Sequence, residues 1–217
     1  MLHPHTLGVR RTYLDPAEVT ALEGADGLAP LAEVRAALGP EVACVVYQQP
    51  NFFGLLEASA ALHEAAHAAG ALAVGVCDPV ALALLEPPGR TGADLVVGEA
   101  QSLGSPMSFG GPLLGYFAAR RALLRAMPGR LVAETVDGQG RRGFVLTLQT
   151  REQHIRRERA TSNICTNEGL MALRATIHLA LLGREGMREM GELCVQKSHH
   201  AARLAAAIAG YRLEFAA

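Results

Sequence analysis

The sequence predicts an α/β protein with a largely parallel sheet, because short apolar segments alternate with helical stretches from about residue 41 onward. Two further observations support a packed chain. Half of the 217 residues are apolar, and the mean hydropathy of +0.18 is too high for a disordered protein. The length corresponds to one domain or somewhat more, at roughly 100–200 residues per domain.

Six segments have the β-branched and apolar composition of strands. They are Val42 to Tyr47, Ala71 to Cys77, Asp94 to Val97, Leu113 to Ala118, Leu131 to Val136 and Phe144 to Leu148. The residues between the last two segments, DGQGRRG, are typical of turns and predict a hairpin.

A helix is predicted over Leu55 to Ala69, ended by Gly70. At about 100° per residue, its alanines and leucines share one face, and its polar residues share the face expected to meet solvent.

Two long helices are predicted at Glu168 to Leu182 and Arg184 to Ala209, separated by Gly183. We therefore divide the chain into an α/β part, residues 1–160, and a helical part, residues 161–217.

The charge balance argues against nucleic acid and anionic membranes as partners. The chain has 20 Lys and Arg against 21 Asp and Glu, a net charge of −1, whereas binders of nucleic acid or anionic membranes usually carry a basic excess. No apolar segment approaches the roughly 18 residues of a membrane span, and the N-terminal residues lack the apolar core of a signal peptide. We expect no nucleic-acid partner, no membrane insertion and a cytoplasmic location.

The cysteines and lysines are distinctive. Cys44, Cys77, Cys165 and Cys194 form no CxxC pair, which favours buried, reduced thiols over a zinc ribbon or a disulfide framework. Nearly all basic residues are arginine, and Lys197 is the only lysine.

The residues His63, Glu64 and His67 match the H-E-x-x-H pattern, in which two histidines bind Zn²⁺ and the glutamate acts as general base. The sequence offers only weak third ligands, Asp78 and Glu86. We favour two histidines on the solvent face of the helix, and keep a zinc metallohydrolase as the alternative function.

Polar residues follow three of the predicted strands, where ligands bind in open α/β sheets. They include Asn51, Asp78, Gln101 and Ser102. Arginines around His154 could meet phosphate or an acidic partner, although a solvated charged helix explains that segment more simply.

Three segments, Gln48 to Gly54, Cys77 to Gly115 and Glu134 to Asn167, together resemble one family over nearly the whole chain. The family is the N-terminal subunit (subunit 1, or α) of the two-subunit bacterial glycine dehydrogenase (decarboxylating), the P-protein of the glycine cleavage system. The resemblance implies a fold-type I PLP-dependent transferase: a three-layer α/β/α large domain, here partial, followed by the start of a helical or α+β C-terminal part. The chain resembles a fragment of that subunit.

The resemblance also implies a reaction, PLP-dependent glycine decarboxylation with transfer of the aminomethyl group to the lipoyl arm of the H-protein. The Schiff-base lysine of the sister subunit corresponds to Gln101, whose amide cannot form an aldimine. Asp78 corresponds to the carboxylate that pairs with the pyridinium nitrogen, and Asn51, Gln101 and Ser102 are further positional equivalents at the cofactor site.

We therefore predict a non-catalytic subunit of an αβ heterotetramer, with PLP carried by subunit 2 (β). Two alternatives remain. In the first, the whole chain is an interaction module without activity. In the second, Asp78, Gln101 and Ser102 act only as loop-capping residues. A partial large domain should expose apolar surface, so we expect self-association or low solubility when the chain is expressed alone.

Overall fold

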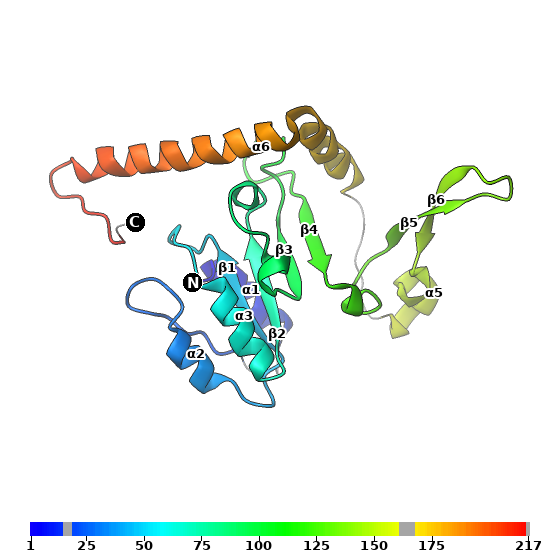
Figure 1. Ribbon diagram of the computed structural model, residues 1–217, viewed down its shortest axis with the longest axis horizontal. Helices are drawn as coiled ribbons and strands as arrows, with labels where there is room; N and C mark the ends of the chain where they lie inside the picture. Colours follow the sequence, from blue (N-terminus) through cyan, green and yellow to red (C-terminus); the bar gives the residue numbers. More distant parts are fainter. Residues whose placement is uncertain (15–18, 161–167, 216–217) are drawn as a thin grey trace. The chain divides into compact units, whose positions relative to one another are not determined.

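The computed structural model describes residues 1–14, 19–160 and 168–215, and it divides into two compact units (Figure 1). Unit 1 comprises Met1–Ala118 and Met171–Ala217, and unit 2 comprises Ala119–Leu170. The predicted division into 1–160 and 161–217 concerns the domains of the longer family chain, and it stays a prediction.

A four-stranded sheet forms the centre of unit 1, in the order β1 (Cys44–Gln49), β2 (Leu72–Cys77), β3 (Leu95–Glu99) and β4 (Gly115–Ala119). The first three strands are parallel, with Val46 opposite Val74 and Val76 opposite Val97. The four strands predicted here are confirmed, with small shifts of their bounds. Strands β1 to β3 are parallel because each connection between them includes a helical crossover. Strand β4 instead begins beside the end of β3, where the backbone N–H of Ala100 donates to the carbonyl of Leu114 at 2.7 Å.

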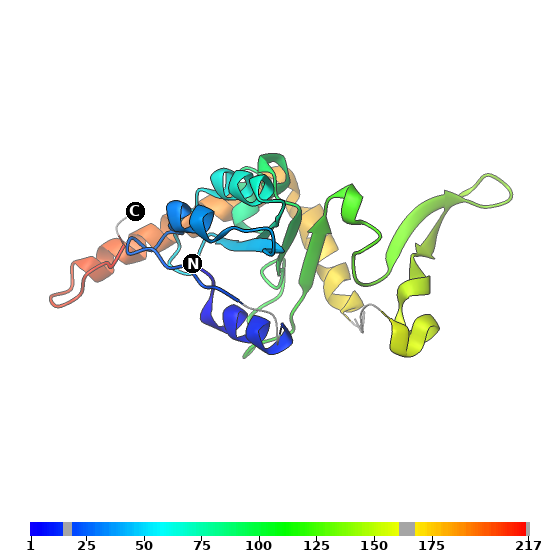
Figure 2. The same ribbon diagram turned by 90° about the horizontal axis from the view of Figure 1, so that it is seen from below.

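Helices α2 (Leu31–Ala37), α3 (Ser59–Ala68) and the short α4 (Pro88–Thr91) lie on one side of the sheet, and α1 (Pro4–Tyr13) lies on the other (Figure 2). Helix α3 contacts β1 and β2 as well as α2 and α4. The buried residues at this contact are small alanines, Ala66, Ala71 and Ala73, which allow the helix to approach the strands closely. The predicted helix is therefore confirmed, although it begins at Ser59 rather than Leu55.

Helix α6 (Gly169–Ala206) spans 38 residues and is interrupted at Gly183, whose φ of 59° and ψ of −167° are not helical. The predicted pair of helices separated by this glycine is confirmed. Ala175 of α6 packs against Ala100 and Leu103, while Gly191 lies against Leu84. Most other side chains of α6 are exposed.

Unit 2 contains the hairpin of β5 (Leu131–Val136) and β6 (Arg142–Thr147), which are antiparallel as predicted, and the short helix α5 (Gln153–Arg156). Asp137 closes the turn. Its carboxylate accepts hydrogen bonds from the backbone N–H groups of Gln139 and Arg141, and these bonds lower its pKa. Single 3-10 turns occur at Ala81–Ala83, Arg121–Leu123, Gln149–Arg151 and Arg157–Arg159.

The expectation of buried cysteines is only partly correct. Cys77 is buried as predicted, but Cys44 and Cys194 are exposed, because β1 is an edge strand and Cys194 lies on the open surface of α6. Cys165 lies outside the described residues. Among the described residues, no helix combines the length and the apolar character that a membrane crossing requires.

Candidate functional site

The parallel strands bring the predicted polar residues to one edge of the sheet. Asn51 follows β1, Asp78 follows β2, and Gln101 follows β3. The backbone N–H of Asp78 donates to the carbonyl of Gln49, which joins the first two of these loops directly. The structure thus places the residues where α/β proteins bind ligands, and their role towards a cofactor stays a prediction.

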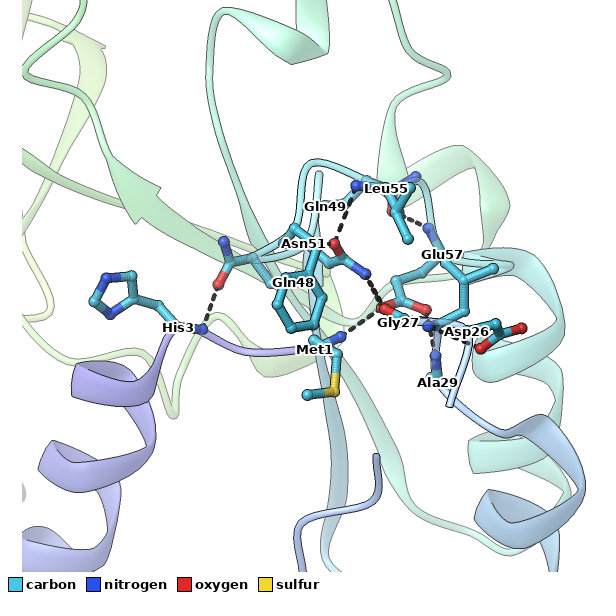
Figure 3. A network of polar contacts seen from close by, with 12 residues as sticks. Met1, His3, Asp26, Gly27, Ala29, Gln48, Gln49, Asn51, Leu55 and Glu57 are labelled. Atoms are coloured by element: carbon cyan, nitrogen blue, oxygen red, sulfur yellow. Dashed lines mark hydrogen bonds and ion pairs between the residues drawn. The ribbon is translucent and has the colours of Figure 1, made fainter. Parts of the chain in front are cut away.

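Asn51 is the most constrained of these residues, with 4% of its surface exposed. Its Oδ1 accepts from the backbone N–H groups of Phe53 and Leu55, each at 3.0 Å. Its Nδ2 donates at 2.8 Å to the carbonyl of Gly27 and to Oε1 of Glu57 (Figure 3). Two accepted and two donated bonds use the usual capacity of an amide side chain. The contacts of Asn51 therefore hold this loop in place.

Glu57 is a buried carboxylate that the sequence analysis missed. Its Oε2 accepts from the backbone N–H of Ala29 at 2.8 Å, and its Oε1 pairs with the amino group of Met1 as well as with Asn51. Its own N–H donates to Oε1 of Gln49 at 2.9 Å. A buried charge needs such partners. The only available signal was a lone acidic residue between the loop and the helix.

Asp78 caps the turn that follows β2. Its Oδ1 accepts from the backbone N–H groups of Val80 at 2.7 Å and Ala81 at 3.1 Å. The carboxylate is exposed, and its negative charge contributes to raising the pKa of the neighbouring Cys77 thiol and the Tyr116 phenol. The loop-capping interpretation of Asp78 matches these contacts.

Gln101 begins a long loop that Glu99 holds at both ends. Oε1 of Glu99 accepts from the backbone N–H of Gln101 at 2.9 Å and from that of Leu114 at 2.7 Å. The side-chain amide of Gln101 donates to the carbonyl of Pro106 at 3.2 Å. Ser102 is exposed in the turn that follows. The amide of Gln101 therefore stabilises its own loop.

Two tyrosines and a thiol lie together against β2. The Tyr116 hydroxyl donates to the carbonyl of Cys77 at 2.7 Å. Burial, followed by the charge of Asp78, raises the pKa of Cys77 to about 11, and burial raises the pKa of both Tyr47 and Tyr116. All three groups are therefore neutral at pH 7, and the Cys77 thiol is not a ready nucleophile.

The prediction of two histidines on a solvent face is wrong for His63, which is 1% exposed. Its Nδ1 lies 2.8 Å from the carbonyl of Thr91, an acceptor, so Nδ1 carries the proton and Nε2 accepts from the Tyr47 hydroxyl at 2.9 Å. The ring is buried because α4 covers this side of α3 in addition to the sheet.

His67 is exposed, as predicted, and pairs with Asp94, with 2.8 Å between Nε2 and Oδ2. Both histidines of the H-E-x-x-H pattern thus bind protein groups. Among the described residues, no group of three or more His, Cys, Asp or Glu side chains could hold a metal ion. Nothing in this geometry favours the zinc metallohydrolase.

The segment around His154 is exposed, as a solvated charged segment would be. Two of its residues depart from that expectation. The guanidinium of Arg151 donates to the carbonyls of Leu124, Arg125 and Gly129, and Glu152 is buried. Arg151 thus joins separate parts of unit 2.

The residues present do not fit PLP as a covalently bound cofactor of this chain. Lys197 is exposed within α6, and the position that the resemblance assigns to the Schiff-base lysine holds the amide of Gln101. An aldimine requires a primary amine at the site.

The chain matches the family model of the glycine cleavage system P-protein over residues 1–214. It is 52% identical over 214 residues to the probable glycine dehydrogenase (decarboxylating) subunit 1 of Desulforamulus reducens, covering 98% of this chain and 48% of the relative. The corresponding protein of Moorella thermoacetica is 55% identical over 185 residues, covering 85% of this chain and 42% of the relative. The chain spans about half the length of the curated relatives it matches.

A crystal structure of glycine decarboxylase (P-protein) of the glycine cleavage system, in inhibitor-bound form, superposes with a TM-score of 0.91 at 50% identity, covering 96% of this chain and 47% of that one. A sphingosine-1-phosphate lyase of Burkholderia pseudomallei, at 18% identity and a TM-score of 0.61, covers 96% of this chain and 45% of its own length, and shows the fold alone. The predicted α/β fold of the PLP-dependent transferases (fold type I) is confirmed by these neighbours.

Proposed function

The chain belongs to the glycine cleavage system P-protein family, and from this we propose that it supports glycine decarboxylation as a non-catalytic part of subunit 1. The reaction would be PLP-dependent and would pass the aminomethyl group to the lipoyl H-protein. The PLP would be held by subunit 2, which the name "subunit 1" of the relatives implies as a partner. The working assembly would be a cytoplasmic heterotetramer.

The proposal rests on the absence of a primary amine at the predicted cofactor position. Gln101 stands where the resemblance places the lysine, and its amide is bonded to its own loop. Lys197, the only lysine in the sequence, is exposed on a helix. Asp78, Asn51 and Ser102 would then help to shape or brace a site whose reacting amine belongs to the partner.

The first test adds pyridoxal phosphate to the purified chain and records its absorbance. We expect no internal-aldimine band and, after borohydride reduction, no specific label. Lys197→Arg serves as a control, because a weak random adduct on this exposed amine would disappear in the variant. A stoichiometric band that borohydride traps on Lys197 would contradict the proposal.

The second test separates a working subunit from an inactive interaction module. We expect the chain to co-purify with subunit 2 and to raise its glycine–bicarbonate exchange rate when the H-protein is present. Binding without any effect on exchange would favour the interaction module. Failure to bind subunit 2 would contradict both.

A further inference from the structure

Unit 2 holds half of the basic residues of this near-neutral chain in about a quarter of its length. Residues 119–170 contain ten arginines and five Asp or Glu residues, a net charge of +5. The remainder of the chain contains ten Lys or Arg and sixteen Asp or Glu residues, a net charge of −6. A charge separation of this kind attracts an oppositely charged surface to unit 2.

The hairpin in unit 2 also exposes one apolar face. The register places Val132 opposite Leu146, Glu134 opposite Phe144 and Val136 opposite Arg142, so these six side chains share a face. Val132, Val136 and Phe144 are 65%, 64% and 64% exposed. Leu131, Ala133 and Thr147 on the opposite face are partly covered. An uncovered face with this much apolar surface is typical of an interaction site.

The charged residues on this face neutralise each other. The guanidinium of Arg142 lies 3.0 Å from Oε2 of Glu134, and its Cζ lies 5.2 Å from the centroid of the Phe144 ring. The centre of the face is therefore uncharged and apolar, and the positive surplus belongs to other residues of the same unit. Protein interfaces commonly combine an apolar centre with surrounding arginines.

We infer that the face formed by Val132, Glu134, Val136, Arg142, Phe144 and Leu146, here called the hairpin face, docks onto an acidic surface of subunit 2. The inference rests on the proposed function, because it assigns a site on this chain to the partner named there. Two copies of this chain that met through their hairpin faces would bring together two units of net charge +5, which disfavours self-pairing. Nucleic acid would leave the aliphatic residues of the face without a suitable contact.

The test measures the affinity of the chain for purified subunit 2 of the same organism. Val132→Ser combined with Phe144→Ser should weaken binding at least about tenfold. Val145→Ser is the matched control, because Val145 is 46% exposed on the opposite face of β6. Arg156→Glu should weaken binding about threefold at low salt and have no effect near 1 M salt, whereas Arg35→Glu in unit 1 should leave binding unchanged.

A second measurement does not depend on how well the serine variants fold. A benzoylphenylalanine photo-crosslinker at position 144 should link the chain to subunit 2, and the same group at Phe53, an exposed residue of unit 1, should not. Crosslinking to a second copy of this chain instead would overturn the inference. So would tighter binding to random-sequence duplex DNA or to phosphatidylserine vesicles than to subunit 2.

The outcomes distinguish an error in the hairpin face from an error in the proposed function. If the unsubstituted chain binds subunit 2 and the hairpin variants bind equally well, the hairpin face is wrong and the proposed function stands. If the unsubstituted chain does not bind, both are wrong.

Discussion

Replacing Asn51 with alanine tests how far one buried amide determines the shape of the sheet edge. The substitution removes four hydrogen bonds that join the loop after β1 to Gly27 and Glu57. Each bond contributes about 1 kcal/mol net, and the bond to the Glu57 carboxylate contributes about 2 kcal/mol. Because water can reach part of the loop, we expect a loss of about 3 kcal/mol.

For a chain of this length, a loss of about 3 kcal/mol corresponds to a fall in melting temperature of about 6–12 °C. Thermal unfolding followed by circular dichroism measures the fall, and hydrogen exchange locates it. The backbone N–H groups of Phe53 and Leu55, which donate to Asn51, should lose their protection. Ser102→Ala is the control, since Ser102 is an exposed polar residue in the loop after β3, at the same edge.

Asn51→Asp extends the comparison. It keeps the acceptor oxygen but places a second carboxylate where Nδ2 now lies, 2.8 Å from Oε1 of Glu57. We expect it to destabilise the chain more at pH 7 than at pH 5, because like charges repel when both groups are ionised. If Asn51→Ala melts within about 1 °C of Ser102→Ala and protection at residues 53 and 55 persists, the structural role of Asn51 is refuted.

Five further outcomes are expected. His63→Ala should lower the free energy of unfolding in urea by about 3 kcal/mol, because it empties a buried site and leaves the Tyr47 hydroxyl without its acceptor. Metal analysis should find no bound zinc in the unsubstituted chain or in this variant. Gly98→Ala should destabilise unit 1 by about 2 kcal/mol or more, since the added Cβ would clash with the Cys77 carbonyl and the Tyr116 ring. Gly143→Ala is the control and should be tolerated, because no atom lies within 4 Å of its added Cβ. Equal melting temperatures of the two variants would contradict this reasoning. In thiol labelling at pH 8 mapped by mass spectrometry, Cys44 and Cys194 should react and Cys77 should not. Because the pKa of Cys77 is raised from its usual value of about 9 to about 11, its contribution to stability is complete below pH 9 and is lost as the pH rises through 11. Urea unfolding of Cys77→Ala should therefore show a flatter dependence on pH between these values. Gln101→Lys should bring an amine to the predicted cofactor position, and visible absorbance with pyridoxal phosphate should appear only in this variant if the assignment of Gln101 is correct.

The regular elements could be read from the sequence because their signals are local. Short β-branched segments located β1 to β3, and a single glycine at position 183 located the interruption of α6. The faces of α3 could not be assigned in the same way. A one-sided pattern describes a helix with one covered side, and α3 also has α2 and α4 against it, which buries His63.

The position of the polar residues at the sheet edge was predictable, but their contacts were not. Parallel strands fix where Asn51, Asp78 and Gln101 lie, because strand ends share an edge. The contacts of Asn51 depend on Gly27 and Glu57, which the sequence marks with no motif. Long-range polar pairs of this kind follow from the packed chain and not from spacing.

The carboxylate of Glu99 has a consequence for how this region can diverge. One oxygen atom fixes both the start and the return of the loop from Gln101 to Leu114, so the geometry at the strand end does not depend on the tip. Met107 and Phe109 at that tip are almost fully exposed. Substitutions and small insertions between residues 107 and 111 can therefore accumulate in related chains while position 101 stays in place, provided that an acidic residue is retained at 99.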